Sequence, residues 1–270
     1  MQNNLMHNIK GAYTIWYRDV LRFVRDRSRI FGSLAQPLLF LFALGFGLGG
    51  SLGHLGSATQ GLFKGPYIEF LYPGILCMTV LFTALFSAIS IVWDREFGFL
   101  REVLVAPVSR TAVALGKVAG GSTVAILQVA IIMLLGPFLG VHYSLVSIVL
   151  MLLTLLLVAA VVTSLGILIA ARQKTMEGFQ VIMQFLLLPM LFLSGAFFPF
   201  TGSDTASRAL RVIAQVNPLT YGVDAVRRIA LGGQLPASFS LHPPGVDVLI
   251  LLGFFEVFLV PGVMLFSKQD

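Results

Sequence analysis

The stretch WDREFGFLREVLVAPVSR, from Trp93 to Arg110, separates two long hydrophobic runs of the sequence. Five charged residues lie within nine positions of one another here: Asp94, Arg95, Glu96, Arg101 and Glu102. A soluble domain would carry about 25% charged residues, whereas this chain has 11% charged and 57% hydrophobic residues. The sequence therefore predicts an all-α integral membrane protein in which this stretch is a polar link between two spans.

The hydrophobic runs on either side belong to a set of candidate transmembrane helices. A helix crosses the hydrocarbon core with about 20 apolar residues. Six segments approach or exceed that length: 33–50, 70–93, 112–139, 145–170, 179–200 and 246–266. Pro189 is expected to kink the fifth of them. We treat residues 1–270 as a single transmembrane domain of six helices, with both termini on the same side of the membrane.

The distribution of Lys and Arg predicts which side that is, because cytoplasmic loops carry an excess of these residues. Thirteen of the 18 Lys and Arg residues fall on one side, six of them before the first span and four around the link between the second and third. The other side holds Lys64, Arg208, Arg211, Arg227 and Arg228. Both termini and the Trp93–Arg110 link are therefore predicted to be cytoplasmic, in a multi-pass protein of the cell (inner) membrane.

Residues 8–29 are predicted to form an amphipathic helix at the membrane–water interface. Its apolar positions recur at helical spacing: Ile9, Tyr13, Trp16, Val20 and Val24. Its basic positions point elsewhere: Lys10, Arg18, Arg22, Arg25 and Arg29. A basic helix with a tryptophan on its apolar side is typical of membrane surfaces, whereas a solvated basic tail would not need the apolar stripe.

Two short helices are predicted on the outer side, within residues 203–231. The first places Ala206, Leu210, Ile213 and Val216 on one face and stops at Asn217-Pro218. The second runs over about 219–231 and ends at Gly232-Gly233, since glycine commonly closes a helix. Both are too short to cross the bilayer, and we expect them to cap a cavity between the spans.

One stretch of the sequence is similar to a nucleotide-binding motif. LGKVAGGST at 115–123 resembles a phosphate-binding loop, but the required first glycine is Thr111 and the required Ser or Thr is Val118. Gly116, Gly120 and Gly121 are instead expected to allow close helix packing. Because no metal or catalytic spacing is present either, we predict no enzymatic activity, bound cofactor, metal or nucleic-acid partner for this chain.

The Trp93–Arg110 link itself has the pattern of a short helix. Over 93–105, Trp93, Phe97, Leu100 and Leu104 share one face, and Pro107 ends the segment. Ser109 is a suitable N-cap for the third span. Aromatic and Arg side chains are favoured at protein interfaces, so the segment is interpreted as a docking helix. The alternative is a solvated loop on the lipid headgroups.

Three segments carry a resemblance to a known family. The segments are Pro73-Gly74 through the Trp93–Arg110 link, FLSGAFFP at 192–199 and NPLTYGVDAVR at 217–227. In these segments the chain resembles the permease subunits of type-2 ABC exporters. The likeness is to the branch that contains daunorubicin-resistance and nodulation-factor export permeases, and it covers nearly the whole chain.

The resemblance implies that 94–106 is a cytoplasmic coupling helix between spans two and three, which docks in a groove of a separate ATPase subunit. The coupling residues would be Asp94, Arg95, Glu96, Phe97, Gly98, Phe99, Leu100, Arg101 and Glu102. It further implies an interfacial N-terminal helix and re-entrant outer helices between spans five and six. The working transporter would contain two permease halves, a homodimer here, and two ATPase subunits that bind ATP and Mg²⁺.

The expected function is ATP-driven export of a hydrophobic or amphipathic solute such as a drug, lipid or glycolipid. A polysaccharide exporter of the same family stays open. An ion-coupled secondary transporter would have several intramembrane ionisable residues and often an internal repeat. A membrane scaffold without transport activity would leave the Pro- and Gln-bearing spans unexplained.

Polar residues inside the predicted spans are candidates for the transport pathway. They are Gln36, Gln128, Gln180, Gln184 and Glu256. Polar side chains within spans also bond neighbouring helices, and the sequence does not separate the two roles. Glu256 falls near the bilayer midplane, where we expect a neutral carboxyl that bonds a neighbouring helix or, alternatively, a group that faces the pathway.

Overall fold

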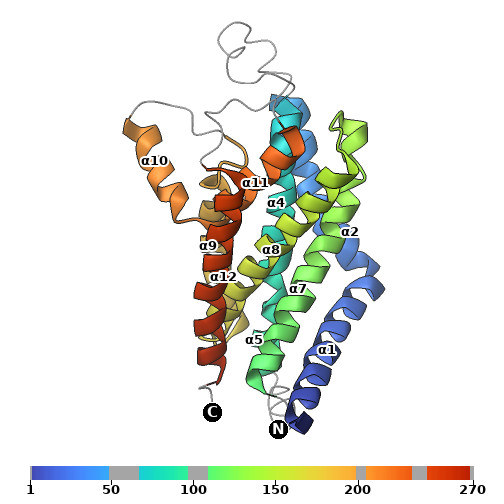
Figure 1. Ribbon diagram of the computed structural model, residues 1–270, viewed down its shortest axis with the longest axis vertical. Coiled ribbons are helices and arrows are strands. Elements are labelled where there is room, and N and C mark those ends of the chain that lie inside the picture. The colour runs from blue at the N-terminus through green and yellow to red at the C-terminus, as the bar shows by residue number, and fades with distance from the viewer. Residues whose placement is uncertain (1, 49–66, 97–108, 199–204, 233–241, 268–270) are drawn as a thin grey trace, which may run out of the picture.

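The computed structural model describes residues 2–48, 67–96, 109–198, 205–232 and 242–267. Within these ranges every regular element is a helix, and the helices form one elongated bundle (Figure 1). Five helical stretches are long and apolar enough to cross a membrane: Ile30–Gly47, Tyr67–Trp93, Arg110–Met133, Leu145–Ala170 and Gly245–Leu265. The predicted all-α membrane fold is confirmed with five spans, and the described N- and C-terminal helices reach the same end of the bundle (Figure 1).

The fifth predicted span, 179–200, corresponds to α9 (Met176–Phe192), which is apolar but has only 17 residues. We predicted a helix over 179–200, and this prediction is wrong at its outer end. The chain leaves the helix through Ser194 and Gly195, and Gly195 has φ 73°. That left-handed conformation favours glycine and is common just beyond a helix end.

The second span is divided into α4 (Tyr67–Ser87) and α5 (Ile89–Glu96). Two serine hydroxyls bond back to the chain at the break: Ser87 Oγ donates to the Ala84 carbonyl at 2.7 Å and Ser90 Oγ to the Ser87 carbonyl at 2.9 Å. Such bonds slightly destabilise and often bend a helix. The predicted coupling segment is therefore preceded by an interruption in the span.

The third span, α7 (Arg110–Met133), begins as predicted, because Ser109 Oγ accepts a hydrogen bond from Ala112 N. It ends six residues before the predicted position 139, and a 3-10 turn, η3 (Gly136–Leu139), follows. Pro137 explains the early end, since it has no N–H to bond the Met133 carbonyl and its ring would clash with that carbonyl in an α-helix.

Close packing around α7 depends on its glycines. A Cβ on Gly116 would lie 2.7 Å from the Ala12 carbonyl oxygen of α1 (Gln2–Arg25), and a Cβ on Gly121 would lie 2.3 Å from Ser87 Oγ. Both distances are too short for any side chain, so the predicted role of these small residues in helix packing is confirmed. α8 (Leu145–Ala170) and α12 (Pro244–Ser267) complete the bundle.

The N-terminal helix differs from the prediction in its start and in its surroundings. α1 begins at Gln2 rather than at residue 8 and runs alongside α7; α2 (Arg27–Phe42) and the π-helical η1 (Ala43–Leu48) follow. Trp16 Nε1 donates to Thr123 Oγ1 of α7 at 3.0 Å. Trp16 and Val20 thus belong to the face that packs within the chain, whereas Ile9, Tyr13 and Val24 are exposed.

The two short helices predicted within 203–231 are present, and they behave differently. α11 (Pro218–Leu231) packs against α4, α8 and α12, with Asn217 as its N-cap and Gly232 at φ 56° closing it. α10 (Thr205–Gln215) stands to one side of the bundle (Figure 1). Its predicted apolar face is open, with Ile213 51% and Val216 74% exposed. The expectation that both helices cap a cavity is therefore wrong for α10, which has too few contacts with the spans.

Candidate functional site

Three helices meet around Lys117 at the end of the bundle that carries the termini. Lys117 on α7 is 4% exposed, and its Nζ lies 3.2 Å from Asp19 Oδ2 of α1. The same ammonium donates to Ser90 Oγ of α5 at 2.8 Å. A buried ammonium costs several kcal/mol unless it is paired and hydrogen-bonded. The three side chains therefore connect α1, α5 and α7 just before the predicted coupling segment.

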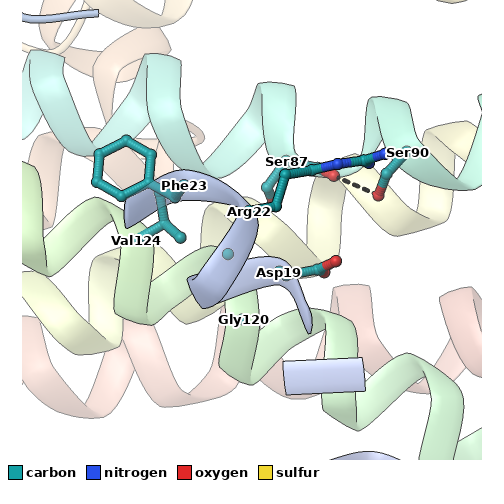
Figure 2. A pocket seen from close by; sticks show the side chains of 8 residues that line it. Asp19, Arg22, Phe23, Ser87, Ser90, Gly120 and Val124 are labelled. Carbon is teal, nitrogen blue, oxygen red and sulfur yellow. Dashed lines mark hydrogen bonds between the residues drawn. The ribbon is translucent and has the colours of Figure 1, made fainter. Parts of the chain in front are cut away.

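A small cavity lies beside this ion pair. Figure 2 shows Asp19, Arg22 and Phe23 of α1 near Ser87 and Ser90 of the α4–α5 break, with α7 lining the remainder. The cavity measures about 30 Å³, which is room for one or two water molecules. We interpret the junction as a mechanical link between helices, because no solute of the expected size would fit.

The predicted coupling residues fall partly outside the described chain. Asp94, Arg95 and Glu96 form the last turn of α5, while Phe97, Gly98, Phe99, Leu100, Arg101 and Glu102 lie outside the described residues. Glu96 Oε2 accepts a hydrogen bond from Met176 N at 3.0 Å. A carboxylate is favourable at a helix N-terminus, and Met176 is the first residue of α9. The start of the coupling segment therefore contacts the start of α9.

Gln128, one of the polar candidates within the spans, is fully buried between three helices. Its amide oxygen accepts from Thr83 Oγ1 of α4, and its amide nitrogen donates to Ser33 Oγ of α2. These are interhelical hydrogen bonds of the kind that hold membrane helices together. In the described chain Gln128 has a packing role.

The other three glutamines are on the surface. Gln36 is exposed on α2, and Gln180 and Gln184 are exposed on α9, where Phe185 is 83% exposed. The structure therefore does not gather the four glutamines into one site. An amide that faces lipid lacks hydrogen-bond partners, so these faces of α2 and α9 are candidates for contact with another chain or with solute.

Glu256 is exposed on α12, near the middle of the Gly245–Leu265 span. The predicted hydrogen bond to a neighbouring helix is not formed in the part of the chain that the structure describes. α12 instead contacts α8 and α11 through other positions, such as the buried Leu251. The carboxyl group is thus on a face that the described chain leaves open.

At the opposite end of the bundle, Arg227 of α11 is 3% exposed and holds two distant segments together. Its Nη2 donates to the Gly195 and Ala196 carbonyl oxygens at 2.9 and 3.1 Å. Its guanidinium carbon lies 3.9 Å from the centroid of the Phe70 ring on α4, a cation–π distance. FLSGAFFP and NPLTYGVDAVR, which carried the family resemblance, are therefore joined directly.

Further contacts tighten this end. Asn217 Nδ2 donates to the Met190 carbonyl at 2.6 Å, and Tyr67 Oη donates to the Phe197 carbonyl at 3.0 Å. Between η3 and α8, burial raises the pKa of the Tyr143 hydroxyl. It therefore stays protonated and donates to Tyr72 Oη of α4 at 2.7 Å. The bonds fix the loops to the ends of the spans.

Two buried carboxylates lie near the start of α12. Asp224 of α11 accepts from His242 N at 3.3 Å and lies 3.9 Å from Arg228 Nε. Asp247 is fully buried, with its Oδ1 3.9 Å from His242 Nδ1. Through His242, these contacts connect α11 with the start of α12.

Sequence reasoning missed the pairing of Lys117 with Asp19 and the partners of Arg227. A signal existed for the first, because Asp19 is the one acidic residue of the basic helix α1 and Lys117 lies inside an apolar run. For Arg227 the motif was noticed, but the carbonyl groups that it binds belong to another segment, and backbone acceptors have no sequence signature.

The chain is similar to known proteins over most of its length. The profile of the family described as ABC-2 type transporter matches residues 11–231. The transport permease ycf38 of Cyanophora paradoxa is 30% identical over 269 residues, which cover 96% of this chain and 89% of the relative. Nodulation protein J of Rhizobium leguminosarum bv. trifolii is 27% identical over 244 residues, covering 89% of this chain and 88% of that protein.

The inner membrane transport permease YadH of Escherichia coli (strain K12) is 29% identical over 250 residues, covering 90% of this chain and 91% of the relative. These relatives are similar to the chain over nearly their whole length. Two of them, ycf38 and YadH, are named transport permeases. Together with the apolar helical bundle, the matches confirm the resemblance seen in the sequence. The chain is a membrane permease that belongs to the ABC-2 type transporter family.

Proposed function

We propose that this permease exports a hydrophobic or amphipathic solute, using ATP that a separate ATPase subunit hydrolyses. The single observation that carries the proposal is the family match over residues 11–231, since ABC-type permeases imply an ABC-type ATPase partner. ATP and Mg²⁺ would be bound by two copies of that partner. The multi-pass chain would reside in the cell inner membrane with both termini in the cytoplasm.

The junction at Lys117 supports a route for the coupling. The ATPase would press on residues 94–106, which are covalently continuous with α5. α5 is separated from α4 by the serine-bonded break at Ser87–Ser90, so it can move as a unit about that point. Lys117 would pass the displacement to α1 and α7, and Glu96 would pass it to α9. Rigid elements that move against one another are a common basis of such switching.

A second copy of the chain is proposed as the partner half. Gln36 of α2 and Gln180 and Gln184 of α9 are exposed among apolar neighbours. Pairing would give their amides hydrogen-bond partners away from lipid. Gln184→Cys should then form a disulfide between two copies under oxidation, whereas Val257→Cys on α12 should not. The reverse result would assign the interface to α12 instead of α9.

The experiment that tests the export proposal is reconstitution of the permease with its ATPase in proteoliposomes. ATPase rate and ATP-dependent transport would be measured with a drug, a fluorescent phospholipid, a glycolipid and a polysaccharide. We expect the amphipathic compounds to stimulate hydrolysis and to move only with ATP. Transport that needs an ion gradient but no ATPase would instead favour a secondary transporter.

A further inference from the structure

A cavity of about 550 Å³ opens between α8, α9 and α12, toward the end of the bundle that carries both termini. Its walls are apolar: Leu168 and Ile169 of α8, Ile182 of α9, and Pro261 and Leu265 of α12. The volume falls within the range that proteins use for small ligands. These side chains offer a ligand only dispersion and hydrophobic contact, so they suit a hydrocarbon chain.

The cavity is bounded on one side by the close approach of α12 to α8. A Cβ on Gly262 would lie 3.5 Å from Leu168 N and 3.6 Å from Leu168 Cα, so the two helices are in contact at that level. Ile182 of α9 is 38% exposed. An apolar space of this kind, open at the side of a membrane helix bundle, is accessible to the surrounding lipid.

The rim of the cavity is polar and positively charged. Arg172 and Gln173 line it, immediately after α8 ends at Ala170. Arg172 is exposed, and its guanidinium forms no ion pair among the residues that the structure describes. An arginine matches phosphate with two parallel N–H···O bonds. The position just beyond the end of an apolar span is the level at which lipid headgroups lie.

We propose that this cavity binds an anionic phospholipid of the surrounding bilayer, with an acyl chain between α8, α9 and α12 and its phosphate against Arg172. Two independent features fit this occupant: the aliphatic walls accept the chain, and the unpaired guanidinium at the rim complements the headgroup charge. Basic pockets between membrane helices are known to hold such headgroups. The inference depends on neither the transported solute nor the direction of transport.

Native mass spectrometry of the delipidated full-length chain tests the proposal. Palmitoyl-oleoyl phosphatidylglycerol and palmitoyl-oleoyl phosphatidylcholine have the same acyl chains and differ in net charge. We expect the first lipid to bind about tenfold more tightly, because the choline ammonium of the second lipid offsets the phosphate charge that attracts Arg172. Arg172→Gln should reduce that preference to about twofold or less.

Two variants act as controls. Lys174→Gln removes a nearby exposed cation that does not line the cavity, and it should leave the preference intact. Ile182→Trp places a bulky ring in the apolar part and should weaken the binding of both lipids. Three results would each overturn the proposal. The first is equal affinity of the unmodified chain for the two lipids, and the second is an equal loss of the preference in Lys174→Gln and Arg172→Gln. The third is undiminished lipid binding by Ile182→Trp.

Discussion

Two buried cations, Lys117 and Arg227, lie toward opposite ends of the bundle and are stabilised in different ways. Lys117 uses a carboxylate and a hydroxyl, and Arg227 uses two backbone carbonyls and an aromatic ring. Each arrangement supplies hydrogen bonds to a cation that would otherwise pay a large desolvation cost. Both cations lie where helices that are distant in the sequence meet, so their effects concern the arrangement of helices rather than a chemical reaction.

Gly74→Ala tests the packing beneath Arg227. The added Cβ would lie 2.4 Å from the Ala196 carbonyl oxygen, which is backbone and cannot turn aside. We expect a loss of about 1–3 kcal/mol in stability, typical of overpacking, measured as a lower Tm of the purified permease. Gly253→Ala on α12 is the matched control, since a Cβ there meets nothing within 4 Å. An equal Tm for the two variants would contradict the close contact.

Glu256→Gln tests whether the open carboxyl group of α12 contributes to transport. Because Glu256 is exposed and faces away from the helices of the described chain, we expect it to be dispensable for transport. Transport and its pH profile should survive the change. Glu256→Leu should favour membrane insertion by roughly 3 kcal/mol. Loss of export of cationic compounds alone in Glu256→Gln would instead show charge recognition.

At the scale of elements, the long apolar helices were predictable and the amphipathic ones were only partly so. α8 occupies the predicted residues 145–170, because a continuous apolar run has one interpretation. α1 was recognised as a helix, yet its contact with α7 depends on Gly116 and on the Asp19–Lys117 pair, which periodicity does not reveal. α10 shows the reverse difficulty: its apolar face was predicted correctly, yet most of that face is exposed in the described chain.

A double-mutant cycle tests the junction of α1, α5 and α7. Asp19→Asn alone leaves the buried Lys117 ammonium without its carboxylate partner. Lys117→Met alone leaves the Asp19 carboxylate without that ammonium. We expect each variant to lower stability by about 2–3 kcal/mol. The double variant should be more stable than the sum of the two losses by about 1–3 kcal/mol, as for residues in contact. Additive losses in thermal unfolding would show that the two side chains do not interact.

For the whole molecule, five of the six predicted spans have helices that meet the length and hydropathy of a membrane crossing. The count was predictable because lipid requires long apolar helices. The candidate site was less so. The coupling segment implied by the family resemblance stays a prediction, whereas Gln128 required coordinates to show that it bonds α2 and α4.

The predicted orientation is a property of the whole molecule and can be measured by labelling. Ser109→Cys and Gln173→Cys should react with an impermeant thiol reagent only from the cytoplasm, and Ser203→Cys only from outside. The native Cys77 is buried and should stay silent. The opposite pattern would overturn the assignment of both termini to the cytoplasm.

The central claim is that a separate ATPase drives this permease through residues 94–106. The most direct test is ATP-dependent transport by the reconstituted complex carrying Phe97→Asp and Leu100→Asp, together with the amount of ATPase that co-purifies. Apolar anchors carry most of the energy of an interface, so charged replacements should abolish both while the permease still inserts at its normal level. Ordinary transport by this double variant at normal expression would contradict the account.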